Sequence, residues 1–231
     1  MINPYLKPLI TLFEENAHPE NAPAMEKYMR NQFPFFGIKT PERKSLVKRF
    51  LKENGLPAID GLEAITRDLW HLPEREYQYT AMTLLDRMRK QIPVEFITLY
   101  EDLITTKSWW DTIDGLASHE VGDVFKRSPE IKHAYLNRWR ASDNFWLRRT
   151  TLLFQLGYKD DTDEALLFSL IRENLGSDEF FINKAIGWAL REYSKRQPQA
   201  VIQFVADTPL VPLSEREALK WLKNKGQLKS P

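Results

Sequence analysis

The chain has 231 residues, of which 42% are hydrophobic and 28% charged, and its formal net charge is only +1. This composition supplies a sizeable apolar core, and the absence of cysteine excludes disulfides, thiolate nucleophiles, cysteine-ligated zinc and iron–sulfur clusters. No apolar run reaches the roughly 20 residues of a membrane span, and no signal peptide, P-loop or dinucleotide-binding motif is evident. We therefore expect a cytoplasmic protein with no membrane partner, no metal and no nucleotide or other cofactor.

The first part of the chain contains a basic region and a clear helix start. In Thr40-Pro41-Glu42, a capping hydroxyl precedes a first-turn proline, which predicts a helix from Thr40. Residues 25–50 contain seven basic and two acidic side chains, whereas residues 159–179 contain two basic and seven acidic ones. The basic region could attract an anion, although two solvated helix faces would show the same charge pattern.

Helix signals continue through the rest of the chain without an alternating strand pattern. SDNFWLRRTTLLFQLGY, from Ser142, and SDEFFINKAIGWALREY, from Ser177, align without gaps at a spacing of 35 residues. Weaker copies begin near Glu76, at SWWDTIDGLASHEVGDVF and at EREALKWLKN. A period of about 33 to 37 residues is typical of stacked helix pairs. The sequence therefore predicts an all-α chain of about a dozen helices, forming one C-shaped α-solenoid domain of HEAT-like repeats over residues 1–231.

The segment TTKSWWDTIDG places two tryptophans beside two aspartates. Neighbouring helix residues point about 100° apart, so Trp109 and Trp110 cannot both face the core. The repeats place an aromatic pair at the start of three helices, which favours a packing role for such a pair. Asp114 aligns instead with Thr150 and Ala185, so it must be solvated, paired or functional. Trp110 and Asp114 are four residues apart and share a helix face, which we predict to face a groove while Trp109 packs inside.

Further candidate residues lie on the next two repeats. Trp188 and Arg191 are three residues apart in IGWALREY, and Arg148 and Arg149 are adjacent cations. Equivalent helices of a solenoid line its concave surface side by side, so these groups could converge on one groove. Indole faces, a carboxylate and guanidinium groups suit a ligand that is part cation and part phosphate.

The motifs KSWWDTID, ASDNFWLRR, KAIGWALREY and MEKYMRNQFPFFGIKTPER together resemble the AlkD family of DNA alkylation-repair glycosylases, over nearly the whole chain and in the expected order. The resemblance implies a monomeric, monofunctional glycosylase of base excision repair that cradles double-stranded DNA in a concave face. Its expected substrates are cationic purines alkylated at N3 or N7, such as 3-methyladenine and 7-methylguanine. The family does not draw the base into a deep pocket. When bound to DNA, such a protein would be nucleoid-associated.

The resemblance also assigns roles to single residues. It gives catalytic roles to Asp114, as the essential carboxylate, and to Trp110 and Trp188, as indoles beside the lesion. The DNA-binding residues that it implies are Tyr28, Thr40, Lys44, Lys48, Arg148, Arg149 and Arg191. Either Arg148 or Arg149 could make the nearer phosphate contact. The alternative function is a non-catalytic helical-repeat module that binds DNA structure or a protein, but a pure binder of polyanionic DNA gains nothing from a carboxylate such as Asp114.

Overall fold

The structure, a computed structural model, describes residues 2–228. These residues form helices joined by turns and loops, and none of them belongs to a β-strand, which confirms the predicted all-α class. In the same stretch, no helix combines the length and apolar character that crossing a bilayer would require. The chain divides into two compact units, residues 1–99 and 100–231.

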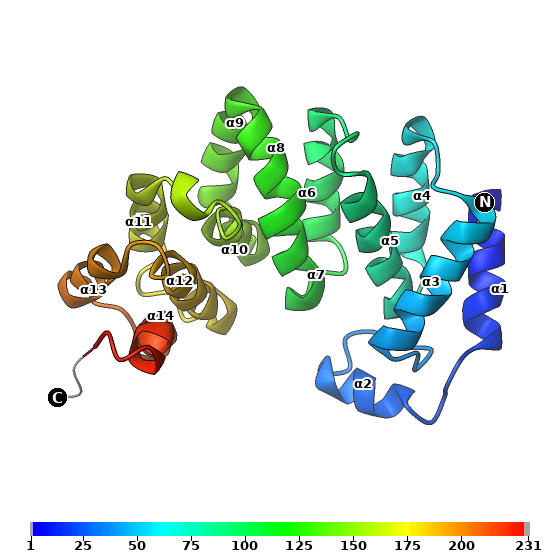
Figure 1. Ribbon diagram of the computed structural model, residues 1–231, viewed down its shortest axis with the longest axis horizontal. Coiled ribbons are helices and arrows are strands. Elements are labelled where there is room, and N and C mark those ends of the chain that lie inside the picture. The colour runs from blue at the N-terminus through cyan, green and yellow to red at the C-terminus, as the bar shows by residue number, and fades with distance from the viewer. Residues whose placement is uncertain (1, 229–231) are drawn as a thin grey trace. The chain divides into compact units, whose positions relative to one another are not determined.

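Unit 1 is built from five α-helices and two short 3₁₀ turns along residues 2–96, and its core is aliphatic and aromatic. The elements are η1 (Pro4–Leu6), α1 (Lys7–Glu15), α2 (Ala22–Tyr28), α3 (Thr40–Asn54), α4 (Ile59–His71), α5 (Arg75–Met88) and η2 (Val94–Phe96). Helix α3 begins at Thr40 with Pro41 in its first turn, but Lys39 is the N-cap and no side chain caps the helix, so the predicted capping role of the Thr40 hydroxyl is wrong. Helix α3 packs against α1, while α4 and α5 lie side by side (Figure 1). The buried core includes Leu9, Phe13, Phe50, Leu62 and Leu84.

A buried carboxylate fixes the loop that leads into α3. The side chain of Glu76, on α5, accepts hydrogen bonds from the backbone nitrogens of Phe36, Gly37 and Ile38 at 3.2, 3.1 and 3.1 Å. Gly37 adopts a φ of +84°, and a Cβ there would lie 2.0 Å from the carbonyl oxygen of His18, so only glycine fits. These contacts fix the path of the loop into α3, and so they fix the position of the first turn of that helix.

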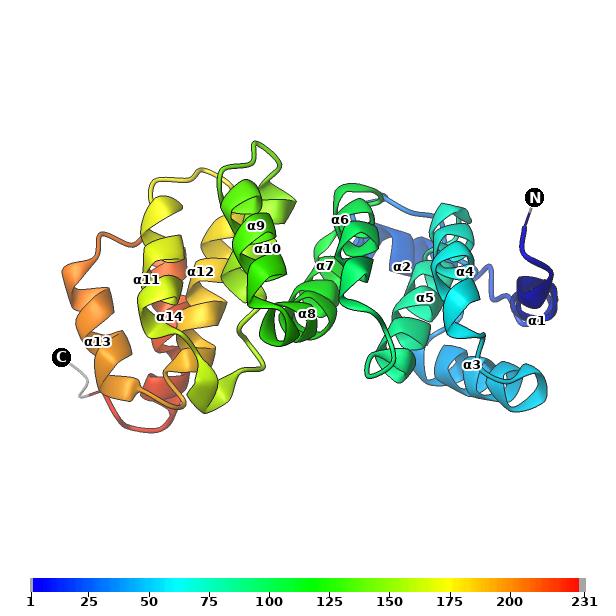
Figure 2. The same cartoon turned by 90° about the horizontal axis from the view of Figure 1, so that it is seen from above.

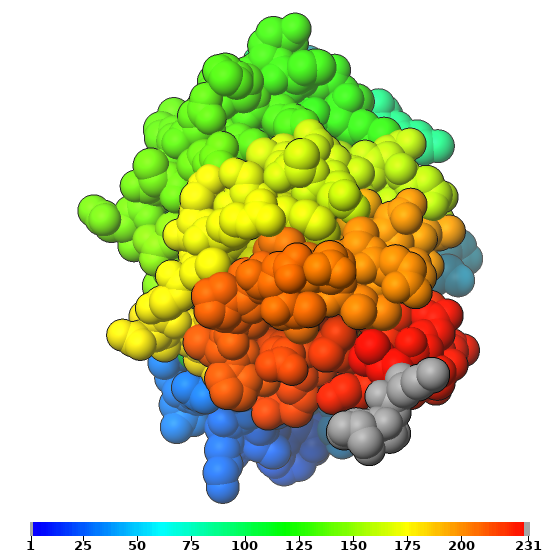
Figure 3. All heavy atoms as spheres, turned by 90° about the vertical axis from the view of Figure 1, so that its left-hand side faces the viewer, coloured from blue at the N-terminus to red at the C-terminus, as the bar shows by residue number. Residues whose placement is uncertain are grey.

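Unit 2 carries the longer series of helices. Helix α6 (Ile97–Thr105) spans the boundary between the units, and the later elements are α7 (Trp110–Gly115), the π-helix η3 (Leu116–Val121), α8 (Gly122–Arg127), α9 (Pro129–Arg140), α10 (Phe145–Leu153), η4 (Lys159–Asp161), α11 (Glu164–Glu173), α12 (Phe180–Tyr193), α13 (Pro198–Asp207) and α14 (Pro212–Asn224). Helices α10 and α12 begin 35 residues apart, at Phe145 and Phe180, as the gap-free alignment predicts. In Figure 3, the segments from α11 to α14, yellow through red, cover the end of this unit as one packed surface.

Helix α12 lies between α10 and α14 and packs most extensively against α14 (Figure 2). Gly187 makes this close approach possible, because a Cβ there would lie 2.5 Å from the Cβ of Glu217 and 2.8 Å from the carbonyl oxygen of Ser214. The hydroxyl of Ser214 donates a hydrogen bond to the carbonyl of Asn183 at 2.8 Å across the same interface. The two helices therefore meet nearly backbone to backbone, and Glu217 is brought directly against α12.

The helical run from α7 to α8 contains a π-helical segment. This segment, η3, follows directly after the helix that carries Asp114, and α8 continues from it without a break. The hydroxyl of Ser118, within η3, donates a hydrogen bond to the backbone carbonyl of Asp114 at 2.7 Å. A π-helical turn shifts the register of a helix and is frequent next to functional sites. Gly122 ends the segment where a Cβ would lie 2.6 Å from the carbonyl oxygen of Phe154.

Candidate active site

Unit 2 contains a pocket of about 340 Å³ that gathers most of the predicted site residues of this unit. Helices α7, α10, α12 and α14 each contribute side chains to its wall. The lining residues are Trp110, Asp114, Arg149, Phe180, Phe181, Lys184, Trp188, Arg191 and Glu217. Five of these were predicted from the sequence, and four were not. The structure thus brings the predicted carboxylate and both predicted indoles to one place.

Asp114 is paired with Arg149 through two parallel hydrogen bonds. Arg149 Nε donates to Asp114 Oδ1 at 2.8 Å, and Arg149 Nη2 donates to Asp114 Oδ2 at 2.9 Å. The side chains are 15% exposed for Asp114 and 3% exposed for Arg149, so the pair is largely removed from water. Of the three possibilities that the sequence left for Asp114, the structure shows that it is paired.

The surroundings of Asp114 act on its pKa in opposite directions. Burial raises the pKa of this carboxyl above the ordinary aspartate value, the charge and hydrogen bonds of Arg149 lower it, and the nearby charge of Asp111 raises it again. Burial dominates, and the net pKa is raised. A carboxylate that is costly to keep charged interacts strongly with any positive charge that enters the pocket, because little water screens it.

The position of Arg149 differs from that expected of a phosphate-binding side chain. Besides its two bonds to Asp114, its Nη1 donates to the backbone carbonyl of Phe181, so the guanidinium is enclosed on several sides. Arg148, the next residue, is half-buried and donates from Nη1 to the carbonyl of Ser142. The pairing had a weak signal in the sequence, since Arg149 directly precedes Thr150, the residue that aligns with Asp114 in the next repeat.

An aromatic cluster forms one side of the site. The ring of Trp109 lies 5.2 Å from that of Phe181 and 6.0 Å from that of Trp146, and the latter two rings are 4.9 Å apart. Trp110 lines the pocket, as predicted. Trp109 packs against these rings but is only half-buried, and it precedes α7 in an extended conformation, so the prediction that it packs inside on a second helix face is wrong. Phe180 is 51% exposed at the first position of α12 and lines the pocket beside these rings.

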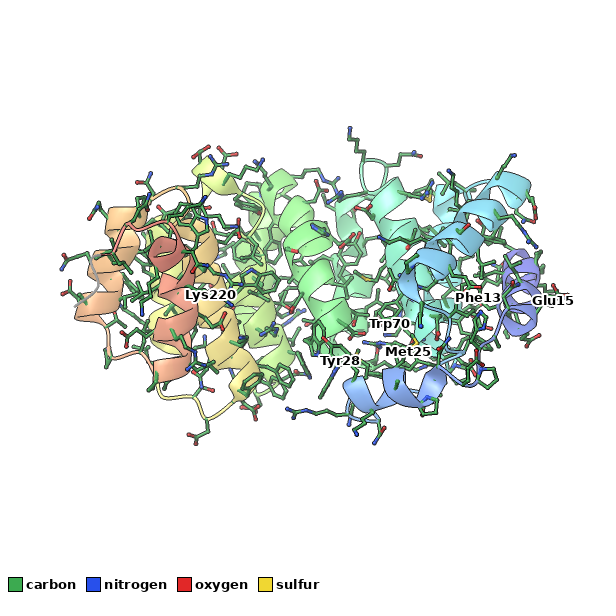
Figure 4. All side chains as sticks on the ribbon, turned by 60° about the horizontal axis from the view of Figure 1, so that its bottom comes forward. Phe13, Glu15, Met25, Tyr28, Trp70 and Lys220 are labelled. Atoms are coloured by element: carbon green, nitrogen blue, oxygen red, sulfur yellow. The ribbon has the colours of Figure 1, made fainter. Side chains whose placement is uncertain are left out.

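A second carboxylate, Glu217, lines the pocket and was not predicted. Its Oε1 accepts a hydrogen bond from Lys184 Nζ, and its Oε2 accepts one from Arg191 Nη1, both at 2.7 Å. The hydrogen bond and charge of Lys184 hold the pKa of Glu217 below its usual range, with further lowering by Arg191 and Lys220. Lys220 is labelled in Figure 4 on α14, one turn beyond Glu217. The sequence signal was faint, because EREALKWLKN is one of the weaker repeat copies.

The predicted DNA-binding residues of unit 1 lie on its surface. Tyr28, labelled in Figure 4, ends α2 and is 72% exposed. Thr40, Lys44 and Lys48 are exposed and follow one another at four-residue intervals, so they share one face of α3. These four side chains belong to unit 1, whereas Arg148, Arg149 and Arg191 belong to unit 2.

The pocket presents a particular set of chemical groups. Its charged groups are Asp114, a partly dehydrated carboxylate paired with Arg149, and the cations Lys184 and Arg191, which are held by Glu217. Within residues 2–228, no group of three or more histidine, cysteine, aspartate or glutamate side chains is arranged to hold a metal ion. Together with the indoles of Trp110 and Trp188, these groups can stabilise a positive charge that is covalently joined to an anionic one.

A family model and a solved structure each match this chain over most of its length. The model of a family described as "DNA alkylation repair enzyme" matches residues 9–222. A solved structure, described as a predicted DNA alkylation repair enzyme from Enterococcus faecalis, is similar with a TM-score of 0.82 and 35% sequence identity, covering 89% of this chain and 96% of that one. No curated protein matches the chain.

Proposed function

Because the chain belongs to the family of DNA alkylation repair enzymes, we propose that it is a DNA glycosylase that hydrolyses the N-glycosidic bond of purines alkylated at N3 or N7. The observation that carries the proposal is Asp114, a buried carboxylate that lines a pocket together with two indoles. A site meant only to hold polyanionic DNA does not need a carboxylate facing its ligand, whereas a glycosylase does.

The proposed reaction begins from a base that already carries a positive charge. Alkylation at N3 or N7 makes the purine cationic, so it departs as a neutral base when the C1′–N bond breaks and its electron pair goes to the base. Positive charge then develops on the deoxyribose, and Asp114 stabilises this oxocarbenium-like transition state. A water oxygen bonds to C1′ and loses a proton, which in this scheme Asp114 accepts as general base.

Arg149 acts in this scheme through Asp114. Its two parallel hydrogen bonds fix the carboxylate plane, and the third, to the Phe181 carbonyl, fixes the guanidinium itself. A carboxylate has about four lone-pair sites, so each oxygen keeps one that Arg149 does not use. Arg149 therefore holds Asp114 charged and oriented, and leaves it able to act on the sugar and the water.

The two indoles supply recognition of the cationic base. Trp110 and Trp188 come from α7 and α12 and line the same pocket as Asp114. An indole face attracts a cation by about 0.5 to 2 kcal/mol, depending on how far water is excluded. This attraction acts on N3- and N7-alkylated purines and not on neutral bases, so it contributes selectivity for damage through charge.

The test is release of free base from duplex DNA that contains 7-methylguanine, measured by chromatography. Wild-type protein should release the base, and Asp114→Asn should reduce the rate by at least about 100-fold, because it removes the charge and keeps the shape. Asp111→Asn is the matched control on the same helix and should have a small effect. DNA binding without base release would instead favour the non-catalytic alternative. A larger effect of Asp111→Asn than of Asp114→Asn would contradict the assignment of the catalytic carboxylate.

A lesion panel tests the charge mechanism separately. Duplexes with 7-methylguanine or 3-methyladenine should be processed, whereas those with hypoxanthine or uracil should not, because a neutral base needs protonation before it departs. Comparable release of the neutral bases would require a general acid that this mechanism does not contain.

A further inference from the structure

Glu217 is a buried acid between two basic side chains at the pocket wall. Its side chain is 11% exposed, while those of Lys184 and Arg191 are 40% and 26% exposed. The carboxylate therefore lies beneath the two cations, and the cations form the surface that a ligand meets. Within residues 2–228, Lys184 and Arg191 each make one side-chain hydrogen bond, and both bonds end on Glu217.

We propose that Glu217 is a positioning residue that holds Lys184 and Arg191 as a two-cation site for a DNA phosphate next to the nucleotide being cleaved. The proposal rests on the glycosylase function proposed above, because it places the phosphate beside the pocket that contains Asp114. It adds Lys184 to the predicted DNA-binding residues, which already include Arg191, and it adds Glu217 as the residue that positions both.

The donors needed for phosphate binding remain available. Lys184 Nζ has three N–H donors and uses one on Glu217, and the guanidinium of Arg191 has five and uses one. Both side chains are long and rotationally free when unpaired, so an anchor that holds them in one conformation reduces the entropy lost on binding. Glu217 is such an anchor, since its two oxygens fix one cation each.

The architecture of α12 and α14 supports this positioning role. Gly187 lies on α12 between Lys184 and Arg191 in sequence, at a point where α14 approaches too closely for a side chain to fit. Because no side chain separates the two helices there, Glu217 reaches both cations from beneath them. The positions of Glu217, Lys184 and Arg191 are therefore set by the packing of two helices, and none of the three lies on a loop.

The charge balance of the cluster gives the proposal a distinctive signature. Lys184, Glu217 and Arg191 carry a net charge of +1, and Glu217→Gln raises it to +2 while removing the anchor. General attraction to DNA should then stay equal or increase, and the dependence of binding on salt should become steeper, by up to about 0.9 in the log–log slope for one added phosphate contact. Base release should nevertheless slow about tenfold, because the cations no longer hold the phosphate in register with Asp114. Binding and rate therefore move in opposite directions.

The experiment measures three quantities for each variant: single-turnover release of 7-methylguanine, affinity for the same duplex across a salt series, and thermal stability. Glu217→Gln is compared with wild type and with Glu215→Gln, an exposed glutamate on the same helix that should behave as wild type in all three. Glu217→Asp keeps the charge but is one methylene shorter, so it should retain the wild-type salt slope and still lose rate severalfold. Lys184→Ala should cost less rate in the Glu217→Gln background than in wild type, because the two residues act together.

Each outcome decides the proposal. Slower release with equal or tighter, more salt-dependent binding supports it. An unchanged rate in both Glu217→Gln and Glu217→Asp overturns it, and so does a parallel loss of rate, affinity and thermal stability, which would mark Glu217 as purely structural. If wild-type protein releases no base, the glycosylase function fails, and the salt slope of Glu217→Gln alone decides the phosphate site.

Discussion

Replacement of Arg149 by methionine isolates what the buried ion pair contributes. Methionine fills a similar apolar volume but donates no hydrogen bond, so Asp114 loses both of its bonds to Arg149 and the Phe181 carbonyl loses its donor. The carboxylate remains in a place where its side chain is only 15% exposed. The variant therefore tests whether Arg149 exists to keep Asp114 charged.

The expected magnitude follows from the burial of the pair. Removal of one partner from a buried ion pair costs about 3 to 5 kcal/mol, and the partial exposure of Asp114 places this case near 3 kcal/mol at about pH 8. For a chain of this size, that corresponds to a fall in Tm of roughly 6 to 12 °C. At about pH 5.5, the unpaired carboxyl can bind a proton, so the loss should shrink to about 1 kcal/mol.

Thermal unfolding at both pH values is the assay, with base release measured in parallel. Arg148→Met is the matched control. The side chain of Arg148 donates a hydrogen bond to the backbone carbonyl of Ser142 and pairs with no buried carboxylate, so this variant should lose little stability. The double variant Arg149→Met with Asp114→Asn should regain about 2 kcal/mol over the single one at about pH 8, because no buried charge is left, but should stay inactive. Equal Tm values for wild type and Arg149→Met at about pH 8, or a double variant no more stable than the single, would refute the reasoning.

Three further predictions concern the wild-type site and the surface of unit 1. Base release should fall on acidification with a midpoint above the ordinary aspartate pKa of about 3.9, because burial raises the pKa of Asp114. On the same acidification, the contribution of Asp114 to the free energy of unfolding should increase, because a group whose pKa is raised in the folded state stabilises the protein less as pH rises. A pH–rate profile with a midpoint at or below that value would argue against Asp114. Lys44→Ala and Lys48→Ala should each lower the salt slope of DNA binding by roughly 0.9, and unchanged slopes would place the DNA elsewhere. Trp188→Leu should slow 7-methylguanine release about tenfold and leave the affinity for undamaged duplex unchanged, whereas equal losses in both would indicate a general packing role.

Local patterns predicted the helices well because helix starts depend on nearby residues. Pro41 marks the first turn of α3, although the Thr40 hydroxyl does not cap it, and the aligned repeats start α10 and α12 at the expected spacing. Helix periodicity alone also predicted that Trp110 and Asp114 share a face, and both line the same pocket. The π-helical segment after Asp114 was not foreseen, because it is a change of hydrogen-bond register that residue propensities do not reveal.

The partners of the pocket acids were harder to predict, because they depend on how separate helices pack. Asp114 was expected to be solvated, paired or functional, but its bond to Arg149 is set by the packing of α7 against α10. Glu217 was not predicted, because it lies in one of the weaker repeat copies and because its contact with Lys184 depends on the close helix packing that Gly187 allows. No period in the sequence encodes that approach.

Both acids of the pocket bind a cation from roughly one repeat away, since 35 residues separate Asp114 from Arg149 and 33 separate Lys184 from Glu217, whose second partner, Arg191, is 26 residues away. Repeat proteins commonly gain or lose whole units, because each unit contacts only its neighbours and a new neighbour of the same kind serves as well. Here the neighbours are not interchangeable. Insertion of an extra unit between α7 and α10, or between α12 and α14, would preserve the apolar packing and separate an acid from its base. The order and number of helices in this part of the chain are therefore constrained by charge as well as by the core, and homologues that vary in length should do so outside these two intervals.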